Sequence, residues 1–286
     1  MLHRGVTGLQ GAKTYGLPYI RAMEKDFPPS SRKLLVGMVH LLPLPGSPGW
    51  RGSMQDVTQR ALHDAAVIEE AGFDALLVEN FGDAPFVPER VPPVAVAALT
   101  AVLVRLSEAT RLPFGVNVLR NDAASALGIA VATGARFIRV NIHSGAMLTD
   151  QGWISGRAHE TVRQRAQFNA PVAICADVLV KHATPLPGVE LVDLARDTRL
   201  RGQADVLIVT GTATGAPTNP ERARLVKQAL PDAPVWIGSG VNADTVNELL
   251  SVADGAIVGS ALKLDGTITN PVDPQRAQAL IRAAGR

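Results

Sequence analysis

The sequence predicts an α/β fold, a single (β/α)8 TIM barrel with a parallel eight-stranded core. Eight short apolar runs alternate with eight helical patterns, an order typical of consecutive strand–helix–strand units that build a parallel sheet. The runs are apolar almost throughout, as expected for strands that protein covers on both faces. Eight units within about 250 residues favour a closed barrel over an open doubly wound sheet. The glycine fingerprint of dinucleotide-binding open sheets is absent from the first strand–helix turn.

Each predicted strand is an apolar run that ends where polar residues, glycine or proline begin. The strands expected on this basis are KLLVGMVH (33–40), DALLVEN (74–80), PFGVNV (113–118), RFIRVN (136–141), PVAICADV (171–178), ADVLIVT (204–210), APVWIGSG (233–240) and ADGAIVGS (253–260). The helices expected between and after them are 56–71, 94–109, 123–133, 159–168, 189–201, 220–230, 243–252 and 274–284.

The composition is that of a globular chain with a large core. Of its 286 residues, 47% are hydrophobic and 19% are charged. The net charge of +2 and the scattered basic residues argue against a nucleic-acid surface. Cys175 is the only cysteine, so no intrachain disulfide forms and a reducing cytoplasm is the expected location.

Nothing in the sequence indicates a membrane or secretion segment. No apolar run reaches the roughly 18–20 residues of a spanning helix. The first thirty residues mix Arg, Lys, Gly and Pro and lack the apolar centre of a signal peptide. We therefore divide the chain into an N-terminal extension or cap, residues 1–32, and a barrel domain, residues 33–286.

Polar side chains gather at the carboxyl ends of the predicted strands, where the active site of a barrel lies. His40 ends the first strand, and Glu79 and Asn80 end the second. The later strands end in, or are followed by, Asn117, Arg120, Asn121, Arg139, Asn141, Asp177, Lys181, His182 and Thr210. Polar groups at one rim are costly unless they are paired or used, so this concentration predicts a functional pocket rather than isolated strand caps.

Five of these residues are the predicted catalytic groups. His40 titrates nearest neutrality and is the expected proton shuttle. Glu79 and Asp177 serve as general base and acid if their environments separate their pKa values. Lys181 either stabilises an enolate or forms a Schiff base, provided that burial lowers its pKa, and His182 is an alternative proton partner for the imine.

The other rim residues are expected to bind substrate or to pair with one another. Amides both donate and accept hydrogen bonds and therefore suit sugar hydroxyls. The expected substrate-binding amides and hydroxyl are Asn80, Asn117, Asn121, Asn141 and Thr210. Arg120 and Arg139 either hold a carboxylate or phosphate in a fork or form structural ion pairs. The carboxylates expected in such pairs are Glu79 and Asp122.

The last two units indicate a phosphate site. WIGSGV places Gly238, Ser239 and Gly240 directly after the seventh strand, and IVGSALK places Gly259 and Ser260 after the eighth. Loops at these two positions often bind phosphate in barrels, because glycines admit an anion to the backbone and a helix N-terminus attracts it. The alternative is that the glycines only permit tight turns. Lys263 either adds positive charge there or points to solvent.

Three further features have open interpretations. A divalent metal is less favoured, because its candidate ligands Glu79, Asp83, Asp177 and His182 show no compact spacing, and no cofactor is predicted. Cys175 lies within an apolar strand and is interpreted as a core residue rather than a nucleophile. The segment 144–156 is long for a strand–helix loop and contains three glycines, so it is interpreted as a lid or as an oligomer contact.

These residues also carry a resemblance. The chain resembles the BtpA family, which includes SgcQ-like proteins, over residues 33 to 273. The motifs concerned are GMVHLLPLPGSP, VENFGDAPF, GVNVLRNDA, FIRVN, TDQG, ADVLVKHA, TGTATG, GSGV, VGSALK and NPVD. The resemblance implies a ribulose-phosphate-binding TIM barrel. The family takes its name from a role in photosystem I accumulation in cyanobacteria, and some relatives occur beside sugar-metabolism genes.

Two classes of function follow from the sequence. The favoured one is an enzyme, an isomerase, lyase or aldolase that acts by acid–base chemistry on a phosphorylated sugar or nucleoside-like molecule. A homo-oligomer is a candidate assembly for the chain. The alternative, implied by the family name, is a non-catalytic factor for the biogenesis of photosystem I or another membrane complex. A scaffold without chemistry has no need of His40, Glu79, Asp177 and Lys181 at one mouth.

Overall fold

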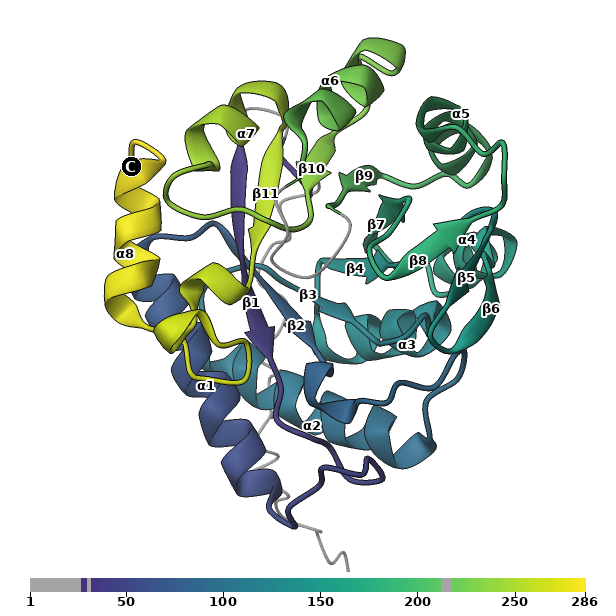
Figure 1. The fold of residues 1–286 in the computed structure, drawn as a ribbon. Helices are drawn as coiled ribbons and strands as arrows, with labels where there is room; N and C mark the ends of the chain where they lie inside the picture. Colours follow the sequence, from purple (N-terminus) through teal and green to yellow (C-terminus); the bar gives the residue numbers. More distant parts are fainter. Residues whose placement is uncertain (1–26, 30–31, 212–217) are drawn as a thin grey trace, which may run out of the picture.

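Eight parallel strands close into a barrel, as the sequence predicts (Figure 1). The computed structural model describes residues 27–29, 32–211 and 218–286. Around the barrel the strands follow the order β1-β11-β10-β9-β7-β4-β3-β2. Their bounds are Leu34–His40 (β1), Ala75–Glu79 (β2), Phe114–Asn117 (β3), Phe137–Val140 (β4), Ala173–Val178 (β7), Val206–Val209 (β9), Val235–Ile237 (β10) and Gly255–Val258 (β11).

A helix follows each strand and packs outside the barrel (Figure 1). The helices are Met54–Ala71 (α1), Pro93–Ala109 (α2), Ala123–Thr133 (α3), Ala158–Gln167 (α4), Leu191–Arg196 (α5), Pro220–Ala229 (α6), Val246–Val252 (α7) and Pro274–Ala283 (α8). α5 continues into a π-helical turn, Asp197–Arg201. α7 begins at Val246 rather than at residue 243, because Asn242 Oδ1 accepts hydrogen bonds from the amides of Asp244 and Thr245 and holds a turn there.

Side chains alternate between two cores along each strand. Those that point inward form the barrel interior: Leu34, Val36, Met38, Ala75, Leu77, Phe137, Ala173, Cys175, Val206, Ile208, Trp236 and Ile257. Those that point outward pack under the helices in a second, larger cluster. Cys175 is fully buried in the inner core, and burial raises the pKa of its thiol well above the ordinary value, which fits a packing residue rather than a nucleophile.

Aromatic rings close the amino-terminal end of the interior. The ring of Phe27 stacks on Phe137 with a centroid distance of 4.8 Å and meets Trp236 edge-on at 6.2 Å. Phe137 and Trp236 stand at or near the start of their strands. Of the predicted extension or cap, residues 1–32, the structure describes only 27–29 and 32. Phe27 is therefore a part of this segment whose contact with the barrel is known.

The predicted loop 144–156 is not a loosely restrained loop. Ala146–Thr149 (β5) and Gly152–Ser155 (β6) form an antiparallel hairpin, and Ala183–Pro185 (β8) pairs with β5 to complete a three-stranded sheet. The inner face of this sheet buries Met147 and Ile154, whereas Leu148 and Trp153 are about half exposed on the other face. Gly152, where β6 begins after the two-residue turn, has a left-handed φ of 95°, and Gly145, just before β5, has one of 71°.

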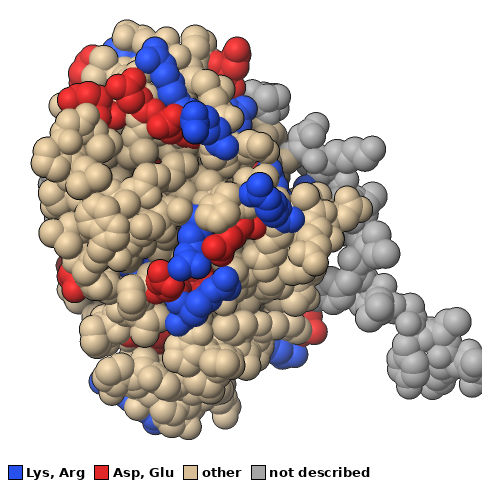
Figure 2. Space-filling model, turned by 90° about the vertical axis from the view of Figure 1, so that its right-hand side faces the viewer, with Lys and Arg blue, Asp and Glu red and all other residues tan. Residues whose placement is uncertain are grey.

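The surface matches the composition. Figure 2 shows one face of the molecule, where basic and acidic side chains are interspersed rather than gathered into a stripe of one sign. Among the helices of the described ranges, none combines the length and the hydropathy that crossing a bilayer requires.

Candidate active site

The strand register brings the ends of four neighbouring strands to one level. His40 pairs in register with Glu79, Glu79 with Asn117, and Asn117 with Arg139. Because these residues share the inward face of their strands, their side chains meet inside the carboxyl mouth of the barrel. Asn141, Asp177 and Thr210 lie at the same mouth, at the ends of β4, β7 and β9.

A recess of about 400 Å³ opens at this mouth. It is lined by Met38, His40, Glu79, Arg139, Lys181, Gly238, Ser239, Gly240, Val241, Ile257, Gly259, Ser260 and Ile268. The recess therefore joins the proton-transfer residues of the first strands to both glycine turns of the last two.

His40 is a buried, neutral imidazole at the edge of the recess. Burial, followed by the charges of Lys263, Lys181 and Arg139, lowers its pKa well below the ordinary value of 6.5. Its Nε2 lies 3.9 Å from Glu79 Oε1, and its ring packs against Phe81 with a centroid distance of 4.9 Å. Within the described residues His40 Nδ1 has no hydrogen-bond partner. Both nitrogens thus remain available for proton exchange.

Glu79 is oriented by a neighbouring amide. Asn117 Nδ2 donates to Glu79 Oε2 over 2.6 Å, and the two side chains are 1% and 7% exposed. The second oxygen, Oε1, faces His40. Asn117 therefore fixes the carboxylate with one of its two amide hydrogens.

Arg139 and Asp177 form a buried bidentate ion pair. Arg139 Nε and one terminal nitrogen each donate to an oxygen of Asp177 over 2.9 Å, and Asn141 Nδ2 donates to Asp177 Oδ2 over 3.0 Å. Burial opposes the charge of Arg139, but the charge and hydrogen bonds of Asp177 and the charge of Glu79 together raise the arginine's pKa. The predicted structural partners of this arginine, Glu79 and Asp122, are thus wrong. With three donors Asp177 positions Arg139 and Asn141 and is poorly placed as a general acid.

Lys181 reaches the recess from the turn after β7. Arg120 donates to the main-chain carbonyl of Lys181 over 2.9 Å, which holds the turn in place. Burial, followed by the charge of Arg139, lowers the pKa of the Lys181 ammonium. Arg120 therefore supports the turn. Within the described residues, two buried polar atoms nearby have no hydrogen-bond partner: Arg120 Nε and Asn141 Oδ1.

The two glycine turns line the recess. Contrary to the prediction from the sequence, neither leads directly into an α-helix. A loop separates β10 from α7, and β11 is followed by a single 3-10 turn, Ser260–Leu262. Gly240 has a left-handed φ of 73°, and a Cβ on Gly259 would lie 3.1 Å from His40 Cε1. Ser239 Oγ accepts from Gly211 N, so this hydroxyl braces the neighbouring loop.

Lys263 takes neither of its predicted positions. Its ammonium is fully buried and pairs with Asp64 Oδ2 over 2.7 Å behind the glycine turns. It faces neither solvent nor the recess, but its charge contributes to the low pKa of His40.

Besides Asp177, Asn117, Arg120 and Asn141, four further predicted residues do not line the recess. Asn80 accepts from Leu119 N and donates to Asp83, so both ends of its amide brace neighbouring loops. Asn121 does the same with the main chain of Ile142. Thr210 is buried and its hydroxyl lies 3.4 Å from Leu179 O. His182 adjoins Lys181 but is exposed, and burial and Lys181 lower its pKa. Asn80 and Asn121 thus brace loops outside the recess, and substrate contacts by these two amides stay a prediction.

No metal cluster forms among the side chains of residues 27–29, 32–211 and 218–286. Asp177 is committed to Arg139, and Asp83 Oδ1 accepts from Leu44 N on the outer side of β2. The four ligands considered from the sequence do not converge.

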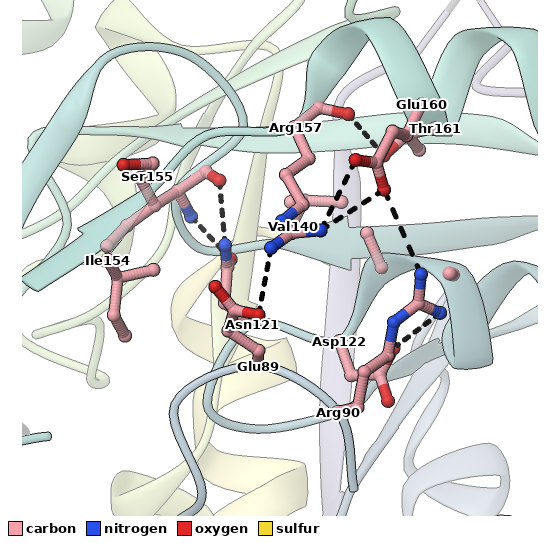
Figure 3. Close-up of a pocket in the computed structure, with 13 residues that line it drawn as sticks. Glu89, Arg90, Asn121, Asp122, Val140, Ile154, Ser155, Arg157, Glu160 and Thr161 are labelled. Atoms are coloured by element: carbon pink, nitrogen blue, oxygen red, sulfur yellow. Dashed lines mark hydrogen bonds and ion pairs between the residues drawn. The ribbon is translucent and has the colours of Figure 1, made fainter.

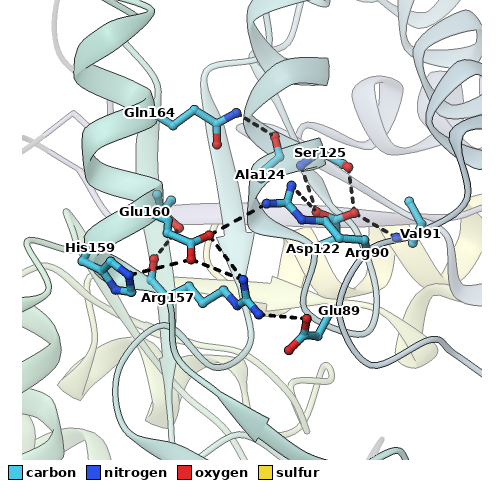
Figure 4. Close-up of polar contacts among 11 residues, drawn as sticks. Glu89, Arg90, Val91, Asp122, Ala124, Ser125, Arg157, His159, Glu160 and Gln164 are labelled. Carbon is cyan, nitrogen blue, oxygen red and sulfur yellow. Dashed lines mark hydrogen bonds and ion pairs between the residues drawn. The ribbon is translucent and has the colours of Figure 1, made fainter.

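A second pocket of about 430 Å³ lies outside the barrel wall, next to the outward-facing Val140 (Figure 3). Alternating charges fill its entrance: Arg157 pairs with Glu89 at 2.8 Å and Glu160 at 3.2 Å, and Arg90 with Glu160 at 3.8 Å (Figure 4). Asp122 caps α3 by accepting from Ser125 N. This pocket is a structural junction between the β2–α2 loop, α3 and α4.

Sequence reasoning missed two contributors to the mouth. Phe81 packs on His40, and Ile268 lines the recess from the segment after β11. Phe81 stands two residues after Glu79, so strand alternation offered a signal. Ile268 lies in an irregular segment, where no periodicity points to it.

The comparisons with known proteins agree with this architecture. The sequence profile of the BtpA family matches residues 31–286. The chain belongs to the BtpA family. It is 48% identical over 249 residues to the photosystem I biogenesis protein BtpA of Synechocystis sp., covering 87% of each chain. It is 32% identical to the putative sgc region protein SgcQ of Escherichia coli over 86% of this chain and 92% of that protein.

Solved structures of similar shape are TIM-barrel enzymes. N-(5′-phosphoribosyl)anthranilate isomerase from Pyrococcus furiosus superposes with a TM-score of 0.53 at 16% identity, over 89% of this chain and 99% of that one. Orotidine 5′-monophosphate decarboxylase from Methanocaldococcus jannaschii gives a TM-score of 0.50 at 16% identity, over 88% and 98%. At 16% identity, the similarity between the BtpA-family chain and these two enzymes shows a shared fold only.

Proposed function

We propose that this BtpA-family chain is an enzyme that acts on a phosphorylated small molecule by acid–base chemistry at the carboxyl mouth of its barrel. One observation carries the proposal: a single recess is lined by His40, Glu79, Arg139 and Lys181 and by both glycine turns, 238–240 and 259–260. Proton-transfer groups and a cradle for an anion are thus within reach of one small ligand.

The glycine turns of the recess admit an anionic ligand. Arg139 and Lys181 also line the recess together with Glu79, and Asp177 is bonded to Arg139. The phosphate is held at Gly240, Gly259 and Ser260, where small residues admit an anion close to the main chain. This places the reacting carbon near His40 and Lys181.

Each remaining group has a role in the proposed reaction. His40, neutral at physiological pH, relays protons between the ligand and Glu79, whose second oxygen is held by Asn117. Asn141 Oδ1 is a buried acceptor without a partner within the described residues, beside the recess at the end of β4, and is proposed to receive a ligand hydroxyl. Support also comes from the structural neighbours, two of which are named for phosphoribosyl or monophosphate compounds.

Binding of inorganic phosphate and sugar phosphates tests the proposal. Thermal unfolding is measured for the wild type and for Ser260→Asp, which puts a negative charge beside the cradle. The control is Ser251→Asp on the exposed side of α7. A ligand at about 100 times its Kd stabilises the folded state by about 2.7 kcal/mol. We expect this gain in the wild type and the control and its loss in Ser260→Asp. Equal gains in all three proteins would exclude the cradle.

The biogenesis role implied by the name of the Synechocystis relative is the second candidate. A chain with that role alone requires no ligand in the recess. It is favoured if no phosphorylated compound stabilises the wild type and if variants of His40, Glu79 and Lys181 retain full function in a cell-based assay of complex assembly.

A further inference from the structure

Among the lysines that the structure describes, Lys181 differs from the others by lacking a partner. Lys33 donates to Leu250 O, Lys227 pairs with Asp254 at 3.0 Å, and Lys263 pairs with Asp64 at 2.7 Å. Within the same residues the Lys181 ammonium has no hydrogen bond and no carboxylate within 4.0 Å. A partly buried cation without a partner is costly, so its retention at the mouth points to use by a ligand.

The backbone around Lys181 is strained. Leu179 and His182 both have φ values of 56°, in the left-handed region that side chains other than those of glycine and asparagine rarely adopt. Each such residue costs on the order of 1–3 kcal/mol and persists where the surroundings impose it, often at functional sites. Here Arg120 pins the Lys181 carbonyl, and β8 follows directly at residue 183. The turn therefore presents the lysine to the recess.

Burial, followed by the charge of Arg139, lowers the pKa of the Lys181 ammonium and so eases the loss of its proton. Arg139 and Arg120 lie on neighbouring elements and oppose a further positive charge, whereas Glu79 and Asp177 act in the other direction. Asp177 is already bonded to Arg139 and Asn141, and Glu79 to Asn117. An uncharged amine is the nucleophilic form.

We propose that Lys181 forms an imine with the carbonyl carbon of a phosphorylated aldehyde or ketone whose phosphate occupies the cradle at Gly240, Gly259 and Ser260. The proposal rests on the proposed function and narrows its substrate class to carbonyl compounds.

The step balances without a cofactor. The Nζ lone pair attacks the carbonyl carbon, and a proton moves from nitrogen to the carbonyl oxygen to give a carbinolamine. A further proton, taken from solvent and relayed by His40, converts the hydroxyl to water. The C–O bond then breaks as the nitrogen lone pair forms C=N, which leaves a protonated imine and one water molecule. The positive imine withdraws electrons from the adjacent carbon, whose proton Glu79 accepts.

Pyridoxal 5′-phosphate tests this assignment, because it carries both an aldehyde and a phosphate. The protein is mixed with less than one equivalent, reduced with borohydride to fix the imine as a secondary amine, and digested for peptide mass spectrometry. Pyridoxal, which lacks the phosphate, is the matched probe. Lys181→Arg keeps the charge but forms no imine, and Lys227→Arg is the control on a surface lysine.

We expect the reduced label on Lys181 ahead of Lys33 and Lys227, its loss in Lys181→Arg and its retention in Lys227→Arg. Excess inorganic phosphate is expected to reduce labelling by pyridoxal 5′-phosphate. Labelling of Lys181 no greater than that of Lys33 and Lys227 overturns the imine, whether or not phosphate binds. Equal labelling of Lys181 by both probes, with no effect of phosphate, keeps the reactive lysine but overturns the phosphate cradle and with it the proposed function.

Discussion

Replacing Asp64 by Asn is expected to destabilise the fold strongly without touching the recess. Asp64 and Lys263 are both 0% exposed and 2.7 Å apart, and Asp64 Oδ1 also accepts from Val272 N over 2.9 Å. Asn keeps the size and a carbonyl acceptor but removes the charge that neutralises the buried ammonium. Leaving one partner of a buried pair uncompensated costs about 3–5 kcal/mol.

That loss is large enough to measure in two ways. At about 2–4 °C per kcal/mol it lowers the melting temperature by roughly 6–20 °C. Urea unfolding followed by both circular dichroism and tryptophan fluorescence gives the free energy, provided that the two transitions coincide. Lys227→Met, which breaks a partly exposed pair with Asp254, is the control and is expected to cost at most about 1 kcal/mol.

The double variant Asp64→Asn with Lys263→Met separates charge from packing. It leaves no unpaired ammonium, so most of the loss in the single variant is expected to return. The reasoning is refuted if Asp64→Asn costs no more than Lys227→Met, or if the losses of the two single variants simply add in the double variant.

Two further expectations concern pH and packing. Burial lowers the pKa of His40 well below 6.5, so the unfolded chain binds this proton more readily than the folded one. His40 therefore leaves the free energy of unfolding unchanged above about pH 6.5 and lowers it as the pH decreases below that value. In urea unfolding, His40→Gln should make the free energy of unfolding depend less steeply on pH below 6.5, whereas His63→Gln, at an exposed histidine, should not. Gly238→Ala is expected to cost about 1–3 kcal/mol, because a Cβ would lie 2.5 Å from Ile208 Cγ2. Gly128→Ala in α3, where a Cβ meets nothing within 4 Å, should be neutral or stabilising; equal costs would contradict the steric argument.

The fold was predictable because each strand carries its own signal. The apolar runs that end at His40, Glu79 and Asn117 fix both the strand and the end of the barrel at which it finishes. Neighbouring residues of a strand point to opposite faces, so Asn80 points outward where Glu79 points into the barrel. This alternation could have excluded Asn80 from the predicted site, but the prediction took all polar residues at the strand ends together.

The partners of the charged residues were not predictable in the same way. Asp64 and Lys263 are 199 residues apart, and Arg139 finds Asp177 on the neighbouring strand β7 rather than the carboxylates expected from the sequence. Such choices depend on three-dimensional packing. The hairpin of β5 and β6 escaped prediction because its pairing with β8 requires a segment that lies after the next strand of the barrel.

The closure of the barrel joins the first strand–helix unit to the last. β1 pairs with β11, α8 lies beside α1 (Figure 1), and Arg286 at the C-terminus bonds to Asp74 and to Lys33 O. During synthesis on the ribosome, β1 therefore emerges long before the strand that covers its open edge. Until β11 and the residues after it have emerged, Asp64 has Arg60 but not Lys263, Asp74 has Arg32 but not Arg286, and the edge of β1 remains exposed. Closure of the barrel thus waits for β11, and until that strand has emerged the nascent chain is open to aggregation at the edge of β1.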